Sequence, residues 1–276
     1  MPGPDAERLA DCCRGHARLV VLTGAGCSTD SGIPDYRDQA GQWKRKPPVQ
    51  QRDFVGHQSV RQRYWARSLL GWRHFSKAAP NDAHRALARL EAAGRVHHLI
   101  TQNVDGLHQQ AGSRAVTDLH GRLDEVECLA CKARIPRSDM QQALESRNPG
   151  WSSLSAAHAP DGDADLEGSD FSGFDVPACG LCGGVLKPAV VFFGDSIPAA
   201  STQTALAEVR GADALLVVGS SLMVWSGFRL VREAAERGIA VAALNLGLTR
   251  ADGLLHLKLA APCGDTLRDA ATALGA

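Results

Sequence analysis

The sequence lacks an excess of charge of either sign. Its 30 Lys and Arg residues balance its 30 Asp and Glu residues, so the formal net charge is zero. A protein without a net positive field has no long-range attraction to a nucleic-acid backbone or to an anionic membrane surface. The composition therefore indicates neither nucleic acid nor a membrane as a partner.

The sequence also lacks a long hydrophobic run. No stretch is apolar enough to span a bilayer. The first seven residues (MPGPDAE) have neither the apolar core of a signal peptide nor the Arg-rich, acid-poor character of a mitochondrial presequence. We therefore expect a cytoplasmic protein. Internal repeats and coiled-coil heptads are absent too, and 276 residues suffice for a large α/β domain with a smaller inserted module.

Four of the eight cysteines form two Cys-x-x-Cys pairs, Cys128 with Cys131 and Cys179 with Cys182. In a chain without a secretion signal, such pairs favour metal thiolates over disulfides. Four thiolates would close a tetrahedral zinc site and leave no coordination position for a substrate. We predict a structural zinc site, with four unligated core cysteines as the alternative. Cys27 has no such pairing, and we expect it to be a packing residue.

Buried-strand patterns alternate with helical patterns along the chain. Continuous apolar runs predict strands at residues 18–23, 96–101, 213–219 and 239–245. Helical patterns lie at residues 7–15, 82–93, 199–210 and 226–237. This alternation predicts an α/β fold, a Rossmann-like parallel sheet with helices on both faces.

Two stretches interrupt this alternation. Residues 38–78 are helical in pattern and rich in Arg, Gln and Trp, and residues 122–186 contain the cysteine pairs. We expect a helical insertion and a zinc-binding module, which together form a smaller lobe. The nucleotide-binding Rossmann-like domain would then comprise residues 1–37, 79–121 and 187–276.

A glycine-rich loop follows the first predicted strand, in the segment GAGCSTDSGIPDYR (residues 24–37). Its glycines let backbone amides approach a pyrophosphate, and Ser28 can add a donor. As a dinucleotide fingerprint the loop is incomplete, because Thr29 occupies the third glycine position. A plain tight turn is the alternative. The PDYR tail adds an acid, an aromatic ring and a cation just downstream.

Two further polar segments follow predicted strands. TQNVDGLH (residues 101–108) lies where ligands bind in open α/β sheets, so we expect Asn103 and Asp105 to face that crevice. A helix cap is the alternative. DLHG (residues 118–121) places His120 beside a glycine that allows another group to approach closely. The pKa of a histidine suits a general base, although a lone histidine is more often structural.

Taken together and in this order, the three segments resemble the sirtuins, from about Leu9 to Leu267. The resemblance continues through KPAVVFFGD (187–195), GSSLMV (219–224) and NLG (245–247), which are similar to the family's peptide-binding and adenosine-binding strings. PDYR, RYWAR (63–67), FFGD and the insert with PDGDAD most resemble class II. That branch contains the mitochondrial sirtuin-4-like enzymes and their bacterial relatives.

The resemblance implies an NAD-dependent protein-lysine deacylase that acts on acyl-lysine proteins or peptides. Its products would be nicotinamide, the deacylated lysine and O-acyl-ADP-ribose. An NAD-dependent protein ADP-ribosyltransferase or a lipoamidase of the class II type is the alternative. A hydride-transferring dehydrogenase fits less well because the third glycine is missing. A non-enzymatic zinc module would not need Asn103, Asp105 and His120 together. We expect a monomer.

The resemblance also implies a role for residues by their position. His120 would be the general base, and Asn103 and Asp105 would hold the ribose side and the carboxamide of nicotinamide. Further NAD contacts would come from Gly24, Ala25, Gly26, Ser28, Asp35, Tyr36, Arg37, Gln102, Val104, Gly219, Ser220, Ser221, Asn245, Leu246, Gly247 and Cys263. The substrate peptide would be clamped as an added strand by Val191, Phe193, Gly194, Met223 and Val224.

Two features bear on the acyl group. Ala189 stands where family members commonly carry an acid, which puts substrate preference in doubt more than catalysis. Tyr64 and Arg67 lie three apart on a predicted helix and so share a face. Acidic-acyl-selective sirtuins use such a pair to hold a carboxylate, so the resemblance implies succinyl-, glutaryl- or methylglutaryl-lysine as better substrates than acetyl-lysine. A surface or packing pair is the alternative.

Overall fold

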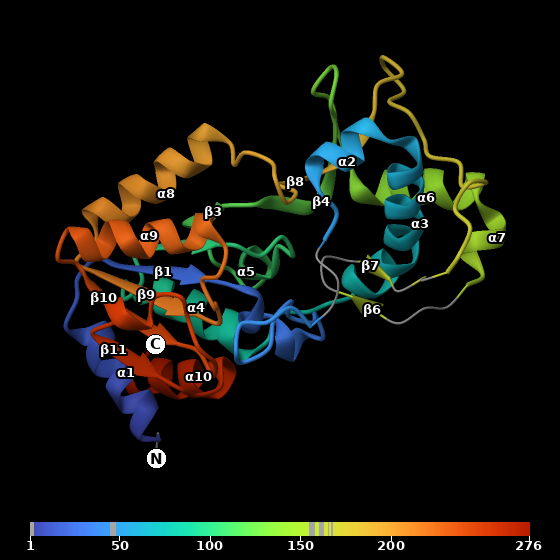
Figure 1. Cartoon of the computed structure of the whole chain (residues 1–276). Helices are drawn as coiled ribbons and strands as arrows, with labels where there is room; N and C mark the ends of the chain where they lie inside the picture. The colour runs from blue at the N-terminus through green and yellow to red at the C-terminus, as the bar shows by residue number, and fades with distance from the viewer. Residues whose placement is uncertain (1–2, 45–47, 155–157, 160–162, 165, 167) are drawn as a thin grey trace.

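The computed structural model describes residues 3–44, 48–154, 158–159, 163–164, 166 and 168–276. The chain forms a larger and a smaller lobe, and both termini belong to the larger one (Figure 1). No helix of the described residues is long and apolar enough to cross a membrane.

The larger lobe is built on a six-stranded sheet. Its strands are β1 (Leu19–Thr23), β2 (His98–Thr101), β3 (Val116–Asp118), β9 (Ala214–Val218), β10 (Ala240–Leu244) and β11 (Leu257–Leu259). Their order is β11-β10-β9-β1-β2-β3, and every neighbouring pair is parallel. From β1 the chain adds β2 and β3 on one side of the sheet. It then returns to β9, on the other side of β1, and adds β10 and β11 outward from there. Ligands bind in such sheets at this switch point, beyond the carboxyl ends of β1 and β9.

Helices cover both faces of this sheet, as Figure 1 shows. One face carries α1 (Pro4–Arg14), α4 (Asp82–Ala92) and α10 (Cys263–Ala273), and the other carries α8 (Ala199–Gly211) and α9 (Trp225–Glu236). Successive side chains of a strand point to opposite faces. In β1, Leu19 and Val21 therefore join one core while Val20 and Leu22 join the other. Burial on both faces explains why the strands are continuous apolar runs.

The smaller lobe combines a sheet with several helices. Its antiparallel sheet has the order β5-β4-β8, from β4 (Gly121–Cys128), β5 (Arg134–Pro136) and β8 (Leu186–Val190). Around it lie α2 (Gln51–Gly56), α3 (Gln58–Phe75), α6 (Arg137–Arg147), α7 (Pro149–Ser152) and the hairpin of β6 (His158–Ala159) and β7 (Asp163–Ala164). One core joins Phe54 and Trp65 of the helical insertion to Val126 and Met140 of the cysteine-containing region. The two insertions therefore form one body.

The predicted fold class is confirmed, and the predicted strands and helices coincide with β1, β2, β9, β10, α1, α4, α8 and α9. The sequence patterns did not identify β3, β11 and α10. One boundary differs from the prediction: we expect residues 187–190 in the Rossmann-like domain, but they pair in β8 with β4 of the smaller lobe. An apolar run identifies a buried strand but not the sheet it joins. Of the PDGDAD insert, residues 160–162 and 165 lie outside the described residues.

Candidate active site

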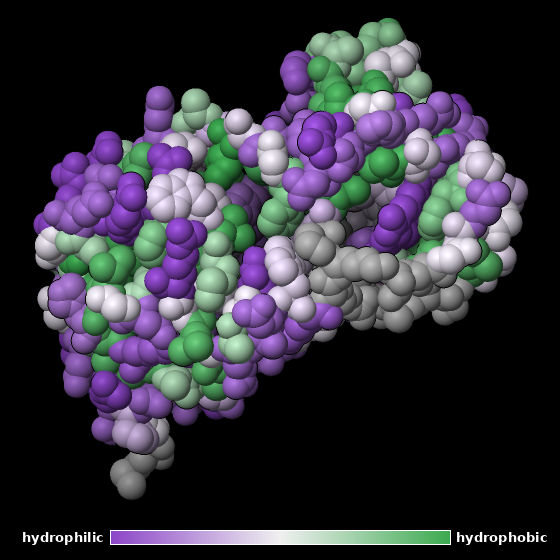
Figure 2. Space-filling model, in the orientation of Figure 1, coloured by the Kyte–Doolittle hydropathy of each residue, from purple (hydrophilic) through white to green (hydrophobic). Residues whose placement is uncertain are grey.

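A cavity of about 1390 Å³ opens at the switch point of the large sheet and is lined by both lobes. Every cofactor-binding, catalytic and substrate-binding residue named in the sequence analysis lies on its wall. Away from it, Figure 2 shows hydrophilic and hydrophobic side chains interspersed on the visible surface of the larger lobe. The cavity is large enough for a dinucleotide together with part of a substrate, because ligand pockets commonly hold about 300–1,000 Å³.

Glycines let two loops approach each other at the floor of this cavity. Backbone hydrogen bonds join Gly24 N to Val218 O (3.0 Å) and Gly26 N to Gly219 O (2.8 Å). A Cβ atom on Gly24 would lie 2.7 Å from Ser220 Cβ, and one on Gly26 would lie 2.9 Å from Gly219 O. Backbone atoms therefore form this surface, as pyrophosphate binding requires. The residues present fit a dinucleotide although the third glycine is missing.

A polar network connects the glycine loop to the loop after β2. Ser28 Oγ donates to Asp105 Oδ2 (2.7 Å) and accepts from Asn103 Nδ2 (2.9 Å). Asn103 Nδ2 also donates to Gly24 O (3.1 Å). Burial raises the pKa of Asp105, which its hydrogen bonds from Leu107 N and Ser28 oppose. Asn103 and Asp105 thus face the crevice as predicted, held against the phosphate loop.

His120 lies on the cavity wall, in the turn directly before β4, and is held by two hydrogen bonds. Its Nδ1 donates to Gln102 O (2.9 Å), so the neutral ring carries its lone pair on Nε2, which accepts from Ser226 Oγ (2.8 Å). Burial lowers the pKa of His120, and the Gln102 carbonyl partly opposes this. The imidazole is therefore neutral at neutral pH, with its basic nitrogen fixed in orientation.

The PDYR segment contributes a wall on the other side of the cavity. The Arg37 guanidinium lies 3.8 Å from the centre of the Trp43 ring, and Nη1 donates to Gly41 O (2.8 Å). Asp35 accepts from Lys44 Nζ (2.5 Å). Burial lowers the pKa of Arg37. A cation stacked on an aromatic ring in this position can meet an anionic ligand.

The predicted peptide-binding segments lie on either side of the His120 region. Gly121 has φ +78°, and its Cα approaches the backbone of Ala189 so closely that a Cβ would lie 2.1 Å from Ala189 O. This contact confirms the predicted close approach beside His120. Val191 N donates to His120 O (2.8 Å), which joins the peptide-binding segment to the base. On the other side, Leu222 adopts φ +56°, a strained conformation for a bulky residue.

The far end of the cavity has a feature that the sequence did not indicate. Tyr64 and Arg67 of α3 share a face as predicted, and both line the cavity. Arg67 Nη2 pairs with Asp163 Oδ2 (2.8 Å), and its Nε donates to Asp163 Oδ1 (3.0 Å) and Ala164 O (2.8 Å). Burial raises the pKa of Asp163, and Arg67 opposes that shift. The guanidinium fork is therefore already occupied by a carboxylate of the chain.

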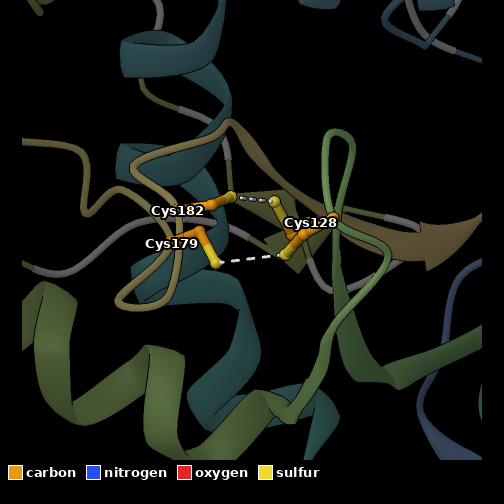
Figure 3. A group of neighbouring side chains, drawn as sticks. Cys128, Cys179 and Cys182 are labelled. Carbon is orange, nitrogen blue, oxygen red and sulfur yellow. Dashed lines mark hydrogen bonds between the residues drawn. The ribbon is translucent and has the colours of Figure 1, made fainter.

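The four paired cysteines converge at the end of β4. The sulfur of Cys128 lies 3.5 Å from that of Cys182, and the sulfur of Cys131 lies 3.8 Å from that of Cys179. Zn–S bonds of about 2.3 Å in a tetrahedron place sulfurs about 3.8 Å apart. In Figure 3, Cys182 points toward Cys128, and the second dashed line runs from Cys179 to Cys131. The backbone N–H of Cys131 lowers the pKa of Cys128 to about 6. The cluster fits a structural zinc ion, and none of the four is in a disulfide.

Sequence reasoning missed two residues that shape the site. Ser226, in the first turn of α9, hydrogen-bonds the basic nitrogen of His120. Asp163 pairs with Arg67 from a segment nearly one hundred positions away in the chain. No local pattern could have identified either, because each acts through a contact made only by the folded chain.

The fold and the cavity define a Rossmann-like nucleotide-binding protein with a cysteine-rich smaller lobe. Residues 24–226 match the model of the Sir2 family. The chain belongs to this family, the sirtuins.

The sequences and structures of known proteins are similar to this chain over almost its whole length. An "NAD-dependent protein deacetylase" of Bordetella bronchiseptica is 59% identical over 265 residues, which cover 96% of this chain and 97% of that protein. "NAD-dependent protein deacetylase 2" of Bradyrhizobium diazoefficiens is 60% identical over 257 residues, covering 93% and 94%. A solved Sir2 complex with a p53 peptide and NAD+ superimposes with a TM-score of 0.79 at 30% identity, covering 98% of both chains.

Proposed function

We propose that the chain is an NAD-dependent protein deacylase, which removes acetyl and related acyl groups from lysine side chains. His120 carries the proposal. It is a half-buried, neutral imidazole on the wall of a cavity that the glycine loops and both peptide-binding segments also line. A relative 59% identical over almost the whole chain is named for this activity, which supports the same reaction here.

Bound NAD would supply a cationic nicotinamide leaving group, so that its glycosidic bond breaks once a weak nucleophile is oriented. We assign the phosphates to Gly24, Ala25, Gly26, Ser28 and Arg37. We assign the nicotinamide and ribose end to Asp35, Tyr36, Gln102, Asn103, Val104 and Asp105, and the adenosine end to Gly219, Ser220, Ser221, Asn245, Leu246, Gly247 and Cys263.

His120 would accept a proton at Nε2. The hydrogen bond from Nδ1 to Gln102 O selects the tautomer that leaves Nε2 unprotonated. A substrate hydroxyl would replace Ser226 Oγ as the partner of that nitrogen. An imidazole whose pKa is lowered by desolvation is in the base form throughout the neutral range, as a general base requires.

The substrate would be an extended acyl-lysine peptide. Val191, Phe193 and Gly194 on one side and Met223 and Val224 on the other would add it as a strand, through backbone hydrogen bonds. The acyl-lysine side chain would then reach inward toward Tyr64 and Arg67.

We retain the proposal that Tyr64 and Arg67 contact the acyl group, but the preference for acidic acyl groups needs revision. A substrate carboxylate would have to compete with Asp163 for the Arg67 fork. Acetyl-lysine and other neutral acyl-lysines carry no carboxylate and so do not compete with Asp163 for Arg67. We therefore expect no strong preference for succinyl- or glutaryl-lysine in the unmodified protein.

We also propose the class II branch, supported by PDYR, RYWAR, FFGD and the long insert. ADP-ribosyl transfer and lipoamide hydrolysis are the alternative activities of that branch. They share the NAD site and would differ in the product: mass added to an acceptor protein, or lipoate released.

The test is nicotinamide release from NAD with a panel of acyl-lysine peptides, with wild type beside His120→Ala. We expect peptide-dependent release with acetyl-lysine and a loss of at least 10²-fold in the variant, the scale of general-base catalysis. NAD binding by His120→Ala, measured separately, controls for folding. Release without a peptide, or release unaffected by the substitution, would contradict the proposal.

A further inference from the structure

A second group of metal-binding side chains lies behind the phosphate loop, apart from the four-cysteine cluster. It consists of Cys27 in the turn η1 (Ala25–Cys27), His84 in α4 and His108 in α5 (Leu107–Gln110). One donor atom from each lies within 4.8 Å of the others. The three residues are 1%, 0% and 1% exposed. Three potential ligands from three separate elements thus meet in the protein interior.

His108 has a nitrogen without a partner. Thr23 Oγ1 donates its proton to Thr101 Oγ1 (2.8 Å), so it can only accept from His108 Nε2 (2.9 Å). Nδ1 of the neutral ring therefore carries the lone pair, and this buried atom has no hydrogen-bond partner among the described residues. Buried polar atoms without partners are rare in folded proteins. An electron-pair acceptor at this position would satisfy Nδ1.

His84 is oriented in a similar way. Its Nδ1 contacts Asn81 at two atoms: Asn81 N–H donates to it at 3.3 Å, and Asn81 Oδ1 lies 3.0 Å away. Metal binding through Nε2 requires the tautomer in which Nδ1 donates to Asn81 Oδ1. The contact of Nε2 with Ser28 Oγ is long, at 3.4 Å. Metal-binding histidines commonly hydrogen-bond a protein group through the other ring nitrogen, which fixes the ring. Asn81 and Thr23 stand in that relation to His84 and His108.

The chemistry of the three groups suits a borderline or soft cation. Burial lowers the pKa of His84 to about 4 and that of His108 well below its ordinary value, so both rings are neutral at neutral pH. A thiolate with two imidazoles is a ligand set that favours Zn²⁺ and related transition-metal ions over Mg²⁺ or Ca²⁺. Burial raises the pKa of the Cys27 thiol, so binding would release its proton to solvent.

The site adjoins the cofactor loop. Cys27 lies between Gly26 and Ser28, which line the cavity, and Ser28 holds Asp105 and Asn103 in place. Zn–N and Zn–S bonds of about 2.0–2.3 Å bring ligand atoms to about 3.3–3.8 Å from one another. Binding would therefore draw the donors together by up to about 1.5 Å and move the phosphate loop.

We propose that Cys27, His84 and His108 form a second metal site, which takes Zn²⁺ or a similar transition-metal ion and weakens NAD binding when it is filled. The metal site itself is independent of the deacylase proposal, and only its effect on NAD rests on that function. Because binding energies are reciprocal, NAD would weaken metal binding by the same factor.

The test adds Co²⁺ to protein whose four-cysteine site already holds zinc. We expect one further ion per chain in equilibrium dialysis, with visible absorption from Co²⁺ and a thiolate-to-metal band, while the zinc content stays constant. Cys27→Val and Cys27→Ser should lose the thiolate band and bind Co²⁺ at least tenfold more weakly. Cys12→Ser, on the surface helix α1, is the matched control and should behave as wild type.

Two outcomes would overturn the site: no second ion in wild type, or equal Co²⁺ binding by the Cys27 variants. For the coupling, calorimetry of NAD binding with and without added Zn²⁺ should show at least tenfold weakening in wild type and none in Cys27→Val. An unchanged NAD affinity would overturn the coupling. A protein that binds Co²⁺ as described but never binds NAD would contradict the proposed function and not the metal site.

Discussion

His120 shows at the scale of single residues how burial prepares a group for catalysis. The Gln102 carbonyl, which can only accept, places the proton on Nδ1, and the Ser226 hydroxyl then donates to Nε2. Desolvation then holds the ring neutral in the pH range where a solvent-exposed histidine would be partly protonated. Ser226 is a positioning residue in this arrangement, since its hydroxyl holds Nε2 of the base until a substrate hydroxyl replaces it.

Asp163 gives a prediction at the same scale. Asp163→Asn should free the Arg67 fork and raise the turnover of succinyl-lysine relative to acetyl-lysine by about tenfold, equivalent to ~1.4 kcal/mol. Measurement of kcat/KM for matched succinyl and acetyl peptides would check this.

A double variant provides the control for that prediction. Adding Arg67→Met to Asp163→Asn should remove the gain, because no cation would remain to hold the carboxylate. A preference that stays the same in all three proteins would show that this end of the cavity does not contact the acyl group.

Gly121 matters at the scale of elements, because it lets β4 lie against β8 directly beside the base. Gly121→Ala would place a Cβ 2.1 Å from Ala189 O on a backbone with φ +78°. We expect a loss of at least ~2 kcal/mol in the free energy of unfolding, from the left-handed backbone and the clash together.

Gly94→Ala is the matched control for that substitution. Gly94 has φ +69° with nothing within 4 Å of the added Cβ, so it should cost only about 1 kcal/mol. Urea unfolding of both variants separates the clash from the backbone strain. Equal losses would mean that the β4–β8 contact relaxes freely.

The cysteine cluster gives a second prediction for elements. Both Cys-x-x-Cys pairs flank the β5-β4-β8 sheet, so the ion would join the start and the end of the cysteine-containing segment, residues 122–186. Removal of zinc by a chelator, or Cys179→Ser, should lower Tm by on the order of 10 °C and abolish activity. Calorimetry with zinc readdition would measure this. A chelated protein that kept its Tm would contradict a structural role.

At the scale of the whole molecule, buried histidines make stability depend on pH. Burial lowers the pKa of His84 from an unfolded value of 6.5 to about 4. As pH falls from 6.5 to 4, His84 becomes protonated in the unfolded chain but stays neutral in the folded chain. The free energy of unfolding therefore decreases. His84 alone should account for about 3 kcal/mol over this range, at 1.36 kcal/mol per pH unit.

Urea unfolding at pH 7, 5.5 and 4.5 would measure that loss. His84→Gln should unfold with a shallower dependence on pH, because glutamine does not titrate. An identical pH dependence in both proteins would contradict the assignment to His84. His108 should add to the effect in the same direction, since burial lowers its pKa as well.

Much of the fold and of the candidate site could be predicted from the sequence, because the patterns that indicate them lie within short segments of the chain. Continuous apolar runs identified four central strands, since both faces of a parallel sheet are buried. The Cys-x-x-Cys spacing indicated the metal cluster, since each pair lies on a short turn that brings two sulfurs together. The order of the polar segments after the strands indicated which edge of the sheet carries the site.

Tertiary structure alone decided the rest, because those features depend on contacts between distant segments. The apolar pattern of residues 187–190 does not indicate that they pair with β4. Nothing near Arg67 in the chain indicates that Asp163 pairs with its guanidinium group. Folding brings Cys27, which the sequence indicates only as a packing residue, beside His84 and His108, and Nδ1 of His108 has no hydrogen-bond partner among the described residues. Local pattern determines which elements form, whereas long-range packing determines which side chains meet and how each is charged.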